Sequence, residues 1–390
     1  MKEDPRLRIG FIPLVDAAAL IVAVDKGFAA EEGLDIELKR EVSWSNVRDK
    51  LNIGLFDAAH LLAPVAIASS LGLGHVRVPI LAPFSLGLNG NAITVSPELH
   101  AALTDAADGD LSDPMISAKT LARIVAERRA QRRDPLTFGM TFPFSTHNYQ
   151  LRFWMAAGGV NPDEDVRLVV LPPPYMVESL ANKHVDAFCV GAPWNSVAVD
   201  LGVGHILHFV SDILTRAAEK VLAVRERWAQ DNPDLLLRLV RAHGRAADFV
   251  ESPDNHAEVA AILAAPHRIG VEAEVIMRTL AGRLKMSPGG DVRTSGRYLL
   301  VGRANAARPD PVQAAWLYAQ MVRWKQAEFS DKLLAEAQAV FRPDIYDAAL
   351  GESVPMPAGE PADGVGAFAG PAFDPGDVAG HIANWAIPGR

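Results

Sequence analysis

Cysteine is nearly absent from this sequence of 390 residues, which contains only Cys189. A single cysteine builds neither a disulfide framework nor a cluster of thiolate metal ligands. Cys189 lies within the apolar run 185–190, where a cysteine is more often a small buried side chain than a nucleophile. The sequence therefore excludes a disulfide-stabilised scaffold and does not favour thiol chemistry.

Long apolar runs and a positive net charge are also missing. No uncharged apolar segment is long enough to span a bilayer, and the first residues, MKEDPRLRIGFIPL, contain no apolar signal core. The 47 acidic side chains outnumber the 38 Lys and Arg side chains, and the net charge of −9 provides no overall positive field to hold nucleic acid. We therefore expect a cytoplasmic protein that contacts neither a membrane nor, directly, nucleic acid.

Motifs of common enzymes and cofactor sites are missing as well. The sequence has no phosphate-binding Walker loop, no dinucleotide-binding glycine pattern, no hydrolase nucleophile elbow and no zinc-protease helix. His205 and His208 are three residues apart on a predicted strand, so they face opposite sides and make poor metal partners. We expect no metal, no cofactor and no enzymatic activity.

The sequence does contain a core-forming composition, 49% hydrophobic, and an alternation of predicted strands and helices. A strand over 7–13, a helix over 17–30 capped by Asp16, and a strand over 34–38 predict a βαβ unit, and the alternation continues to about residue 90. It resumes after about residue 135. We expect an α/β protein of two lobes, each a mainly parallel sheet flanked by helices, with a small ligand in the cleft between them.

The predicted order along the chain is 1–90 for the first part of lobe I, 91–215 for lobe II, 216–350 for the return to lobe I and the C-terminal helices, and 351–390 for a tail. The tail is dominated by Gly, Pro and Ala, which is typical of an extended segment held against the protein or a partner. Glu219 and Lys220 are expected in a turn before a strand over 221–225. A loop over 287–297 is expected to follow a helix over 271–284.

The stretch 144–159, FSTHNYQLRFWMAAGG, follows a predicted strand and begins with the candidate helix caps Ser145 and Thr146. A helix that starts near His147 directs free backbone N–H groups and a partial positive charge at whatever lies before it. An anion site with His147 and Gln150 at its mouth is one interpretation. An exposed first turn with no ligand is an equally good one.

Further donors lie at the ends of predicted elements, namely Trp44, Asn91 and Lys220. Together with His147 and Gln150 they suit a weakly basic, permanently charged anion. Lys220 supplies a fixed positive charge, and His147 can add a second one if the anion raises its pKa. Trp44 fits a hydrophobic staple at a helix start as well as the wall of a pocket.

Six segments resemble the solute-binding proteins of ABC importers of the nitrate, sulfonate and taurine kind. They are VAVDKGFAAEEGLDIEL (22–38), EVSWSNVRDKLNIGLFDAAHLLAP (41–64), LNGNAITV (88–95), STHNYQLRFWMAAGG (145–159), APWN (192–195) and EKVLAVRERWAQDNP (219–233). Their combination is similar to the nitrate-binding and bicarbonate-binding branch, over about residues 7–350. The resemblance implies the type II periplasmic-binding-protein-like fold, with the ligand in the cleft between the lobes.

The nitrate pocket of that branch uses a tryptophan, a histidine and a lysine that correspond to Trp44, His147 and Lys220 in this sequence. A glutamine of the family's inter-lobe strand corresponds to Asn91. The bicarbonate pocket, by the same resemblance, lacks the His and Lys pair and uses an acidic residue with calcium. The resemblance therefore implies nitrate or nitrite as the ligand.

Cytoplasmic members of the branch are nitrate/nitrite sensors that regulate nitrate assimilation as one half of a two-component regulatory system. Such a sensor sequesters an RNA-binding antitermination regulator and releases it when the anion binds. Transport members carry an export signal, which is missing in this sequence, so the resemblance implies the sensor. One alternative is an ABC-transporter solute-binding protein whose signal was removed. The other is an enzyme of the thiamine-pyrimidine synthase type, but those enzymes carry a cysteine-rich motif that does not fit a chain with only Cys189.

Overall fold

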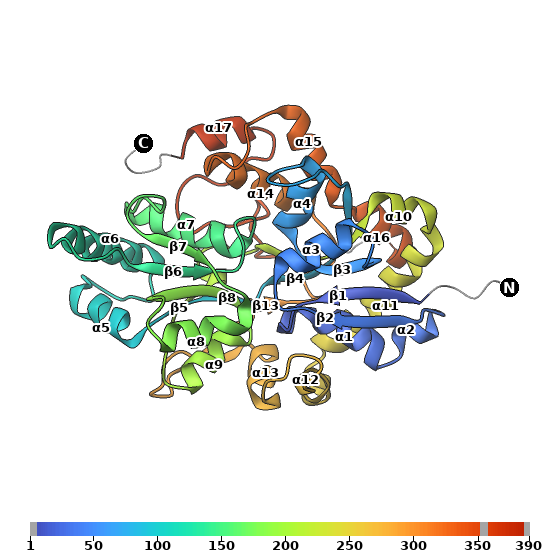
Figure 1. Ribbon diagram of the computed structural model, residues 1–390, viewed down its shortest axis with the longest axis horizontal. Helices are drawn as coiled ribbons and strands as arrows, with labels where there is room; N and C mark the ends of the chain where they lie inside the picture. Colours follow the sequence, from blue (N-terminus) through green and yellow to red (C-terminus); the bar gives the residue numbers. More distant parts are fainter. Residues whose placement is uncertain (1–5, 352–357, 386–390) are drawn as a thin grey trace.

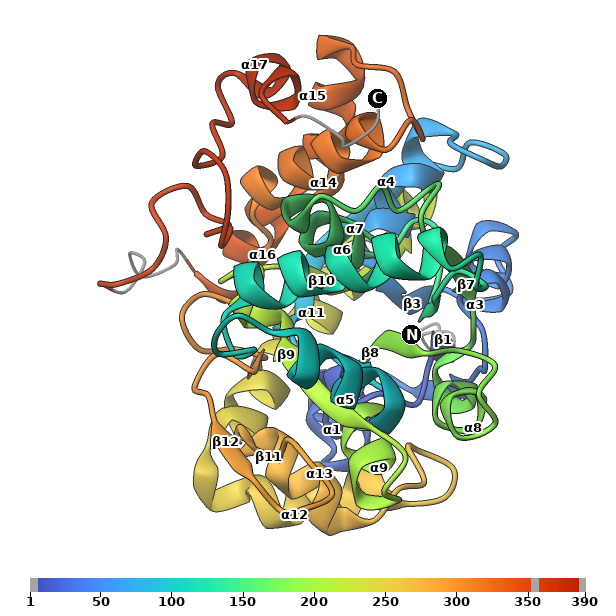
Figure 2. The same cartoon turned by 90° about the vertical axis from the view of Figure 1, so that its left-hand side faces the viewer.

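The computed structural model describes residues 6–351 and 358–385, which form two lobes side by side, each around its own sheet (Figure 1). The remaining parts of the predicted lobe I and tail, residues 1–5, 352–357 and 386–390, lie outside the described residues. Helices pack on both faces of each sheet. Figure 2 shows α14, α15 and α17 together on one side of the molecule, and β11, β12 and α12 on the opposite side.

Lobe I is built on a six-stranded sheet with the strand order β13-β4-β10-β3-β1-β2. Its strands are β1 (Leu7–Phe11), β2 (Ile36–Arg40), β3 (Ala58–Leu62), β4 (Ile80–Asn89), β10 (Ala218–Arg225) and β13 (Leu299–Leu300). Every residue of β3 and β4 is buried. Strands that are covered on both faces need apolar residues on both, which explains the continuous apolar runs in this part of the sequence.

Lobe II is built on a five-stranded sheet with the strand order β7-β6-β8-β5-β9. Its strands are β5 (Asn91–Val95), β6 (Thr137–Met140), β7 (Arg167–Val170), β8 (Ala187–Gly191) and β9 (His205–Phe209). Helix α7 covers one face of this sheet, and α8 and α9 cover the other (Figure 1). Both lobes thus have the three-layered arrangement expected of an α/β protein.

Both sheets are mixed, whereas the sequence predicts mainly parallel ones. In lobe I, β1 is parallel to β2 and β3, but β10 is antiparallel to β3 and β4, and β13 is antiparallel to β4. In lobe II, β6 is parallel to β7 and β8, while β5 is antiparallel to β8 and β9. The difference arises because β5 follows β4 directly where the chain changes lobe. No crossover helix precedes β5 to impose a parallel direction on it.

The helices of lobe I lie in three stretches of sequence. They are η1 (Val15–Ala17), α1 (Ala18–Asp25), α2 (Phe28–Glu31), α3 (Trp44–Asn52), α4 (Ala63–Leu71), α10 (Glu226–Asp231), α11 (Pro233–Glu251), η4 (Pro253–Asn255), α12 (His256–Ala264), α13 (Ala273–Leu280), α14 (Pro311–Arg323), α15 (Asp331–Val340), α16 (Pro343–Leu350) and α17 (Val378–Ala383). Those of lobe II are α5 (Pro97–Ala106), α6 (Pro114–Ala130), α7 (Thr146–Gly158), η2 (Pro173–Tyr175), α8 (Met176–Ala181), α9 (Trp194–Asp200) and η3 (Val210–Asp212).

A short hairpin replaces the end of one predicted helix and part of the loop after it. Helix α13 ends at Leu280, and Gly282 follows with a φ of 63° that L side chains rarely adopt. Strand β11 (Arg283–Lys285) then pairs antiparallel with β12 (Val292–Thr294). The predicted helix over 271–284 therefore extends too far, and the predicted loop over 287–297 contains a strand.

The chain crosses from lobe I to lobe II at Asn89 and Gly90, whose φ angles are 61° and 80°. The Asn89 amide donates hydrogen bonds to the carbonyls of Thr215 and Arg297, both at 2.9 Å, and its oxygen accepts one from the N–H of Ala217 at 3.0 Å. Residues 213–217 carry the chain back to lobe I. One buried side chain therefore joins the outward crossing, the return crossing and the segment before β13.

The described part of the tail, 358–385, packs against the return crossing. The N–H groups of Thr215 and Arg216 donate to the carbonyls of Gly366 and Val365 at 2.8 and 2.9 Å. Farther along, the Trp385 ring contacts Phe153 of α7 with a centroid distance of 4.7 Å. The tail thus holds the crossing and also contacts a helix of lobe II.

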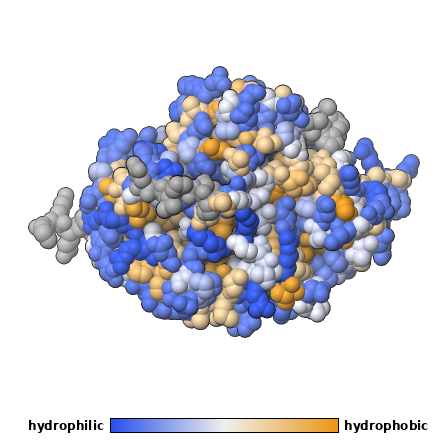
Figure 3. Space-filling view, turned by 180° about the vertical axis from the view of Figure 1, so that it is seen from behind, coloured by the Kyte–Doolittle hydropathy of each residue, from blue (hydrophilic) through white to orange (hydrophobic). Residues whose placement is uncertain are grey.

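The surface mixes polar and apolar residues. On the face shown in Figure 3, apolar residues occur in small groups among polar ones, as is usual for a folded protein in water. Within the described ranges, no helix combines the length and the apolar character that crossing a bilayer requires.

Replacing Asn89 by glycine should lower the free energy of unfolding by about 2–4 kcal/mol, because two carbonyls and one N–H group lose buried hydrogen-bond partners. Alanine should cost roughly 1–2 kcal/mol more than glycine, since a Cβ atom is unfavourable at a positive φ. Urea unfolding followed by tryptophan fluorescence measures both. Equal stability of the wild type and the two variants would show that Asn89 does not hold the crossings.

Candidate functional site

A buried ammonium group lies where the two lobes meet. Lys220, on β10, has no exposed surface, and its Nζ donates hydrogen bonds to Asp16 Oδ2 at 2.8 Å and Glu219 Oε2 at 2.5 Å. Both carboxylates are buried as well. Removing the ammonium charge would leave two buried carboxylates without a counter-charge, so both carboxylates depend on Lys220.

Glu219 and Lys220 are neighbours on a strand, and neighbours normally point to opposite faces of a sheet. Strand β10 begins at Ala218, so both residues lie in the strand and not in the predicted turn. Its pairing with β4 is irregular here, with register shifts between Ala218 and Lys220 and between Lys220 and Val221. An irregularity of this kind re-aims side chains, which allows the two neighbours to bond each other.

Asp16 is held by a second partner. His60, at the centre of β3, has its Nε2 at 2.9 Å from Asp16 Oδ1, while its Nδ1 accepts from the Ile12 N–H at 3.4 Å. His60 Nε2 therefore carries the proton and donates it to Asp16. Asp16 was expected to cap a helix over 17–30, but it lies within η1, and α1 receives no side-chain cap hydrogen bond; the carboxylate instead bonds Lys220.

Trp44 begins α3, after Ser43 has accepted a hydrogen bond from the Asn46 N–H as the helix cap. Its ring lies 5.4 Å from Lys220 Nζ and 5.4 Å from the His60 ring. The side chain is 1% exposed. Trp44 therefore forms a wall beside the ammonium group.

Lobe II contributes the first turn of α7. Ser145 caps this helix by accepting from the Asn148 N–H, and Gly159 ends it with a φ of 102°, as the sequence predicts. His147 and Gln150 lie one turn apart and share a face. Both are fully buried, so the alternative of an exposed first turn is wrong. His147 Nε2 lies 3.4 Å from Glu219 Oε2, which brings the two lobes together.

Asn91, the first residue of β5, completes the cluster. Its Nδ2 donates to Gln150 Oε1 at 3.4 Å. Gly191, on the neighbouring strand β8, pairs with Asn91. A Cβ atom on Gly191 would lie only 3.3 Å from Asn91 Oδ1 and 3.5 Å from Asp16 Oδ2. The glycine therefore leaves room around these polar atoms.

The two carboxyls differ in protonation. Burial raises the pKa of each, but for Asp16 the charge of Lys220 and the hydrogen bond from His60 outweigh burial, so its pKa is lowered. For Glu219, burial outweighs the opposing effect of Lys220, and the charge of Asp16 adds to it, so its pKa is raised. Burial lowers the pKa of Lys220, but the charges of both carboxylates reverse this, so its pKa is raised. Lys220 therefore stays charged, and Glu219 is the carboxyl more easily protonated.

The two histidines are neutral at pH 7. Burial lowers the pKa of His60 despite its bond to Asp16, and burial together with the charge of Lys220 lowers that of His147 well below its usual value. His147 was expected to gain a positive charge only if a bound anion raises its pKa, and that expectation stays a prediction. The Thr141 hydroxyl lies 3.1 Å from His147 Nδ1 and can donate to it, which leaves the proton on Nε2.

Several buried polar atoms of the cluster have no hydrogen-bond partner among the described residues. They are Trp44 Nε1, Asn91 Oδ1, His147 Nε2, Gln150 Nε2 and Glu219 Oε1. Such groups each cost on the order of 1–3 kcal/mol when left unsatisfied. Several of them belong to one cluster with an ammonium group, where a small polar ligand can satisfy them together.

All five residues predicted from the sequence, Trp44, Asn91, His147, Gln150 and Lys220, belong to this cluster. The prediction missed three of its members, Asp16, His60 and Glu219. Asp16 and His60 had one available signal, because each lies close to the carboxyl end of a predicted parallel strand. No sequence signal indicated Glu219, because only the irregular pairing of β10 brings its carboxylate to the cluster.

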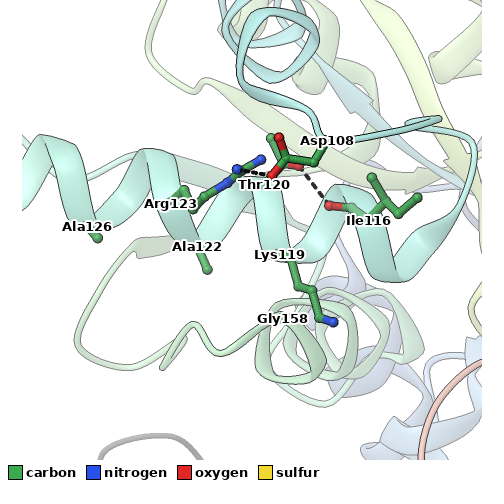
Figure 4. Close-up of a pocket in the computed structure, with 8 residues that line it drawn as sticks. All are labelled: Asp108, Ile116, Lys119, Thr120, Ala122, Arg123, Ala126 and Gly158. Carbon is green, nitrogen blue, oxygen red and sulfur yellow. Dashed lines mark hydrogen bonds and ion pairs between the residues drawn. The ribbon is translucent and has the colours of Figure 1, made fainter.

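A separate surface pocket of about 610 Å³ lies along α6, lined by Asp108, Ile116, Lys119, Thr120, Ala122, Arg123, Ala126 and Gly158 (Figure 4). Gly158 is the last residue of α7. At about 1.5 Å per residue, it lies roughly 16 Å along the helix from His147. This pocket contains none of the predicted site residues.

Comparisons with known proteins were consistent with one another. A model described as the NMT1-like family matches residues 1–264. The nitrate import ATP-binding protein NrtC of Synechocystis sp. is 31% identical over 388 residues, which are 99% of this chain and 56% of NrtC. The bicarbonate transport ATP-binding protein CmpC of the same organism is 31% identical over 354 residues, 90% of this chain and 50% of CmpC. The chain therefore spans about half the length of these curated relatives.

A solved structure extends the comparison to the whole fold. The crystal structure of the periplasmic nitrate-binding protein NrtA from Synechocystis superposes on this chain with a TM-score of 0.85 at 27% identity, and the match covers 98% of both chains. The two-lobed periplasmic-binding-protein-like fold expected from the sequence is thereby confirmed.

Replacing Lys220 by methionine should lower the free energy of unfolding by about 3–5 kcal/mol at about pH 7.5, because Asp16 and Glu219 then lack a counter-charge. The loss should shrink towards about pH 5, since buried carboxyls with no cation beside them have raised pKa values and become neutral. Wild-type Asp16, whose pKa is lowered, stays ionised over this range. Urea unfolding at the two pH values measures the difference.

The exposed Lys332 offers a control for that experiment, because its side chain is 83% exposed. Lys332→Met should change the free energy of unfolding by no more than about 0.5 kcal/mol at either pH. A loss in Lys220→Met that does not depend on pH would contradict the assignment of the buried carboxylates.

Proposed function

The chain belongs to the NMT1-like family, and on that premise we propose that it is a solute-binding protein that holds nitrate or nitrite between its two lobes. The likeness of the whole fold to the nitrate-binding protein NrtA supports this ligand class. Equal identity to NrtC and CmpC does not separate nitrate from bicarbonate. The choice therefore rests on the residues of the site and on the resemblance of Trp44, His147 and Lys220 to the nitrate pocket of the family.

One observation carries the proposal: three buried N–H donors without described partners belong to the same cluster as the Lys220 ammonium group. Trp44 Nε1, His147 Nε2 and Gln150 Nε2 lack hydrogen-bond partners within residues 6–351 and 358–385. A small planar oxoanion offers acceptor oxygens in several directions and carries the negative charge that an ammonium group attracts. Hydrogen bonds to a charged group are stronger than neutral ones, so these donors can each contribute to binding.

The donors come from both lobes. Trp44 and Lys220 belong to lobe I, and His147 and Gln150 belong to the first turn of α7 in lobe II. A ligand bound by all four connects the lobes and stabilises the arrangement in which they face each other. The ligand can shift the equilibrium between open and closed forms only by its different affinity for the two.

An enzymatic role on this fold has less support. Cys189 is fully buried, with its Sγ 4.0 Å from Gln150 Oε1. Burial raises the pKa of the Cys189 thiol well above its usual value, whereas a nucleophilic cysteine needs its thiolate form. We propose that Cys189 packs beside the binding site and carries out no chemistry.

Calorimetric titration with nitrate, nitrite, bicarbonate and sulfate tests the proposal, and binding of nitrate or nitrite alone is the expected result. Trp44→Phe removes one N–H donor and keeps most of the ring, so it should weaken nitrate binding by roughly 10–100-fold. The matched control is Trp324→Phe, which also removes a buried indole N–H without a described partner, but outside the cluster. The nitrate affinity of this control variant should equal that of the wild type. Equal effects of the two substitutions, or selective binding of bicarbonate or sulfate, would refute the site.

The sensor role is a further proposal that rests on the sequence resemblance. It requires a cytoplasmic location and an RNA-binding antitermination regulator that is released when the anion binds. The likeness to importer proteins supports the alternative, a solute-binding protein of an ABC importer, better than it supports the sensor. Fractionation of cells that express the native gene separates the two. Recovery with the cytoplasm, and nitrate-dependent release of a co-purified RNA-binding protein, are expected of a sensor; recovery outside the cytoplasm would exclude it.

A further inference from the structure

The Glu219 carboxylate uses only one of its two oxygens. Its Oε2 accepts a hydrogen bond from Lys220 and lies 3.4 Å from His147 Nε2. Its Oε1 is buried and has no hydrogen-bond partner in the described part of the chain. A carboxylate oxygen can only accept, whereas a carboxylic acid can also donate. The state of this oxygen therefore decides whether Glu219 repels an anion or binds it.

The charges around Glu219 oppose the binding of an anion. The ionisable groups that face it are Lys220 on β10, Asp16 in η1, His60 on β3, His147 on α7 and Cys189 on β8. Both histidines are neutral at pH 7, and so is the Cys189 thiol. The amide of Asn91 is the neutral neighbour on β5, and its interaction with the carboxyl lowers the pKa of Glu219 by less than burial raises it.

With Asp16 and Glu219 both ionised, one ammonium group faces two carboxylates, and the cluster has a net charge of −1 before any ligand binds. A bound nitrate would make the net charge of the cluster −2, although its members are buried. Repulsion between like charges within one buried cluster strongly disfavours a state in which both carboxyls stay ionised beside the anion. A monovalent anion needs either a cation or a proton to enter with it.

We propose that Glu219 binds the anion as a neutral carboxylic acid, so that one proton from the solvent enters the site with each nitrate. The proton is transferred from the buffer to Glu219, and no covalent bond of the anion changes. Protonated Oε1 then donates to an oxygen of the anion, beside the donors Trp44, His147 and Gln150. Glu219 is thus a specificity-determining residue, and this inference rests on the proposed function of the same site.

The surroundings of the two carboxyls indicate which of them takes the proton. Asp16 accepts hydrogen bonds at both oxygens, from Lys220 and from His60, which stabilise its ionised form. Glu219 has one oxygen without a hydrogen-bond partner in the described ranges, and burial already raises its pKa. A bound anion raises the pKa of Glu219 further, since it is a like charge beside the carboxyl.

Calorimetric titration with nitrate in two buffers of different ionisation enthalpy measures the proton uptake. We expect about one proton per nitrate at a pH above the pKa of Glu219 in the unliganded protein. In that range the affinity should fall about tenfold for each pH unit, because binding and protonation are linked one to one. Nitrate binding without proton uptake at such a pH would overturn the inference and leave the proposed function intact. Absence of nitrate binding would overturn both.

The variant Glu219→Gln tests whether Glu219 or His147 takes up the proton. The glutamine amide is neutral at every pH and can donate as the protonated acid does. The variant should bind nitrate with no proton uptake and with an affinity that does not change with pH, tighter than the wild type at about pH 8.5. Glu178→Gln, an exposed site on α8, is the matched control and should behave like the wild type. Proton uptake that persists in Glu219→Gln would assign the proton to another group and refute the inference.

Discussion

The ammonium group of Lys220 is the feature on which the rest of the site depends. A buried charge needs counter-charges, and the chain supplies them from η1 and from the residue next to Lys220 itself. The positive charge is therefore already compensated before an anion arrives. Affinity for the proposed anion would come mainly from neutral donors without partners among the described residues, and the lobes supply these from Trp44, His147 and Gln150. An acidic protein can hold an anion in this way without any net positive charge.

Protonation follows from the same arrangement. Two carboxylates share one ammonium group, and their pKa values shift apart because Lys220 and a hydrogen bond from His60 stabilise ionised Asp16, whereas burial dominates the pKa of Glu219. The histidines contribute as neutral donors.

Sequence reasoning recovered the parts of the site that depend on local patterns. The start of α7 followed from the Ser145 cap and the Gly159 end, and residues one turn apart on that helix, His147 and Gln150, necessarily share a face. Trp44 and Lys220 were predicted as donors at the ends of elements, and the family resemblance then assigned them to the pocket. The contact of Asp16 with Lys220 joins residues 204 positions apart, and no local pattern indicates it.

The direction of the strands was the main error in the predicted fold, and its cause is also non-local. Alternating strands and helices normally indicate parallel pairing, but β5 follows β4 directly and β10 returns from lobe II to run antiparallel between β3 and β4. The same strand carries the irregular pairing that brings Glu219 beside Lys220. Periodicity in the sequence reports which residues are buried, and it does not report how a strand is paired with partners far along the chain.

The central position of β10 has a consequence for how the protein is made. Strands β3 and β4 do not pair with each other; β10 lies between them. On the ribosome, β10 emerges only after all of lobe II has been synthesised, so the nascent lobe I lacks its middle strand until then. Pairing of this kind is distant in sequence and is formed late and slowly. Because β10 also carries Lys220, a nascent chain gains the ammonium group of the candidate site in the same step that completes the core of lobe I.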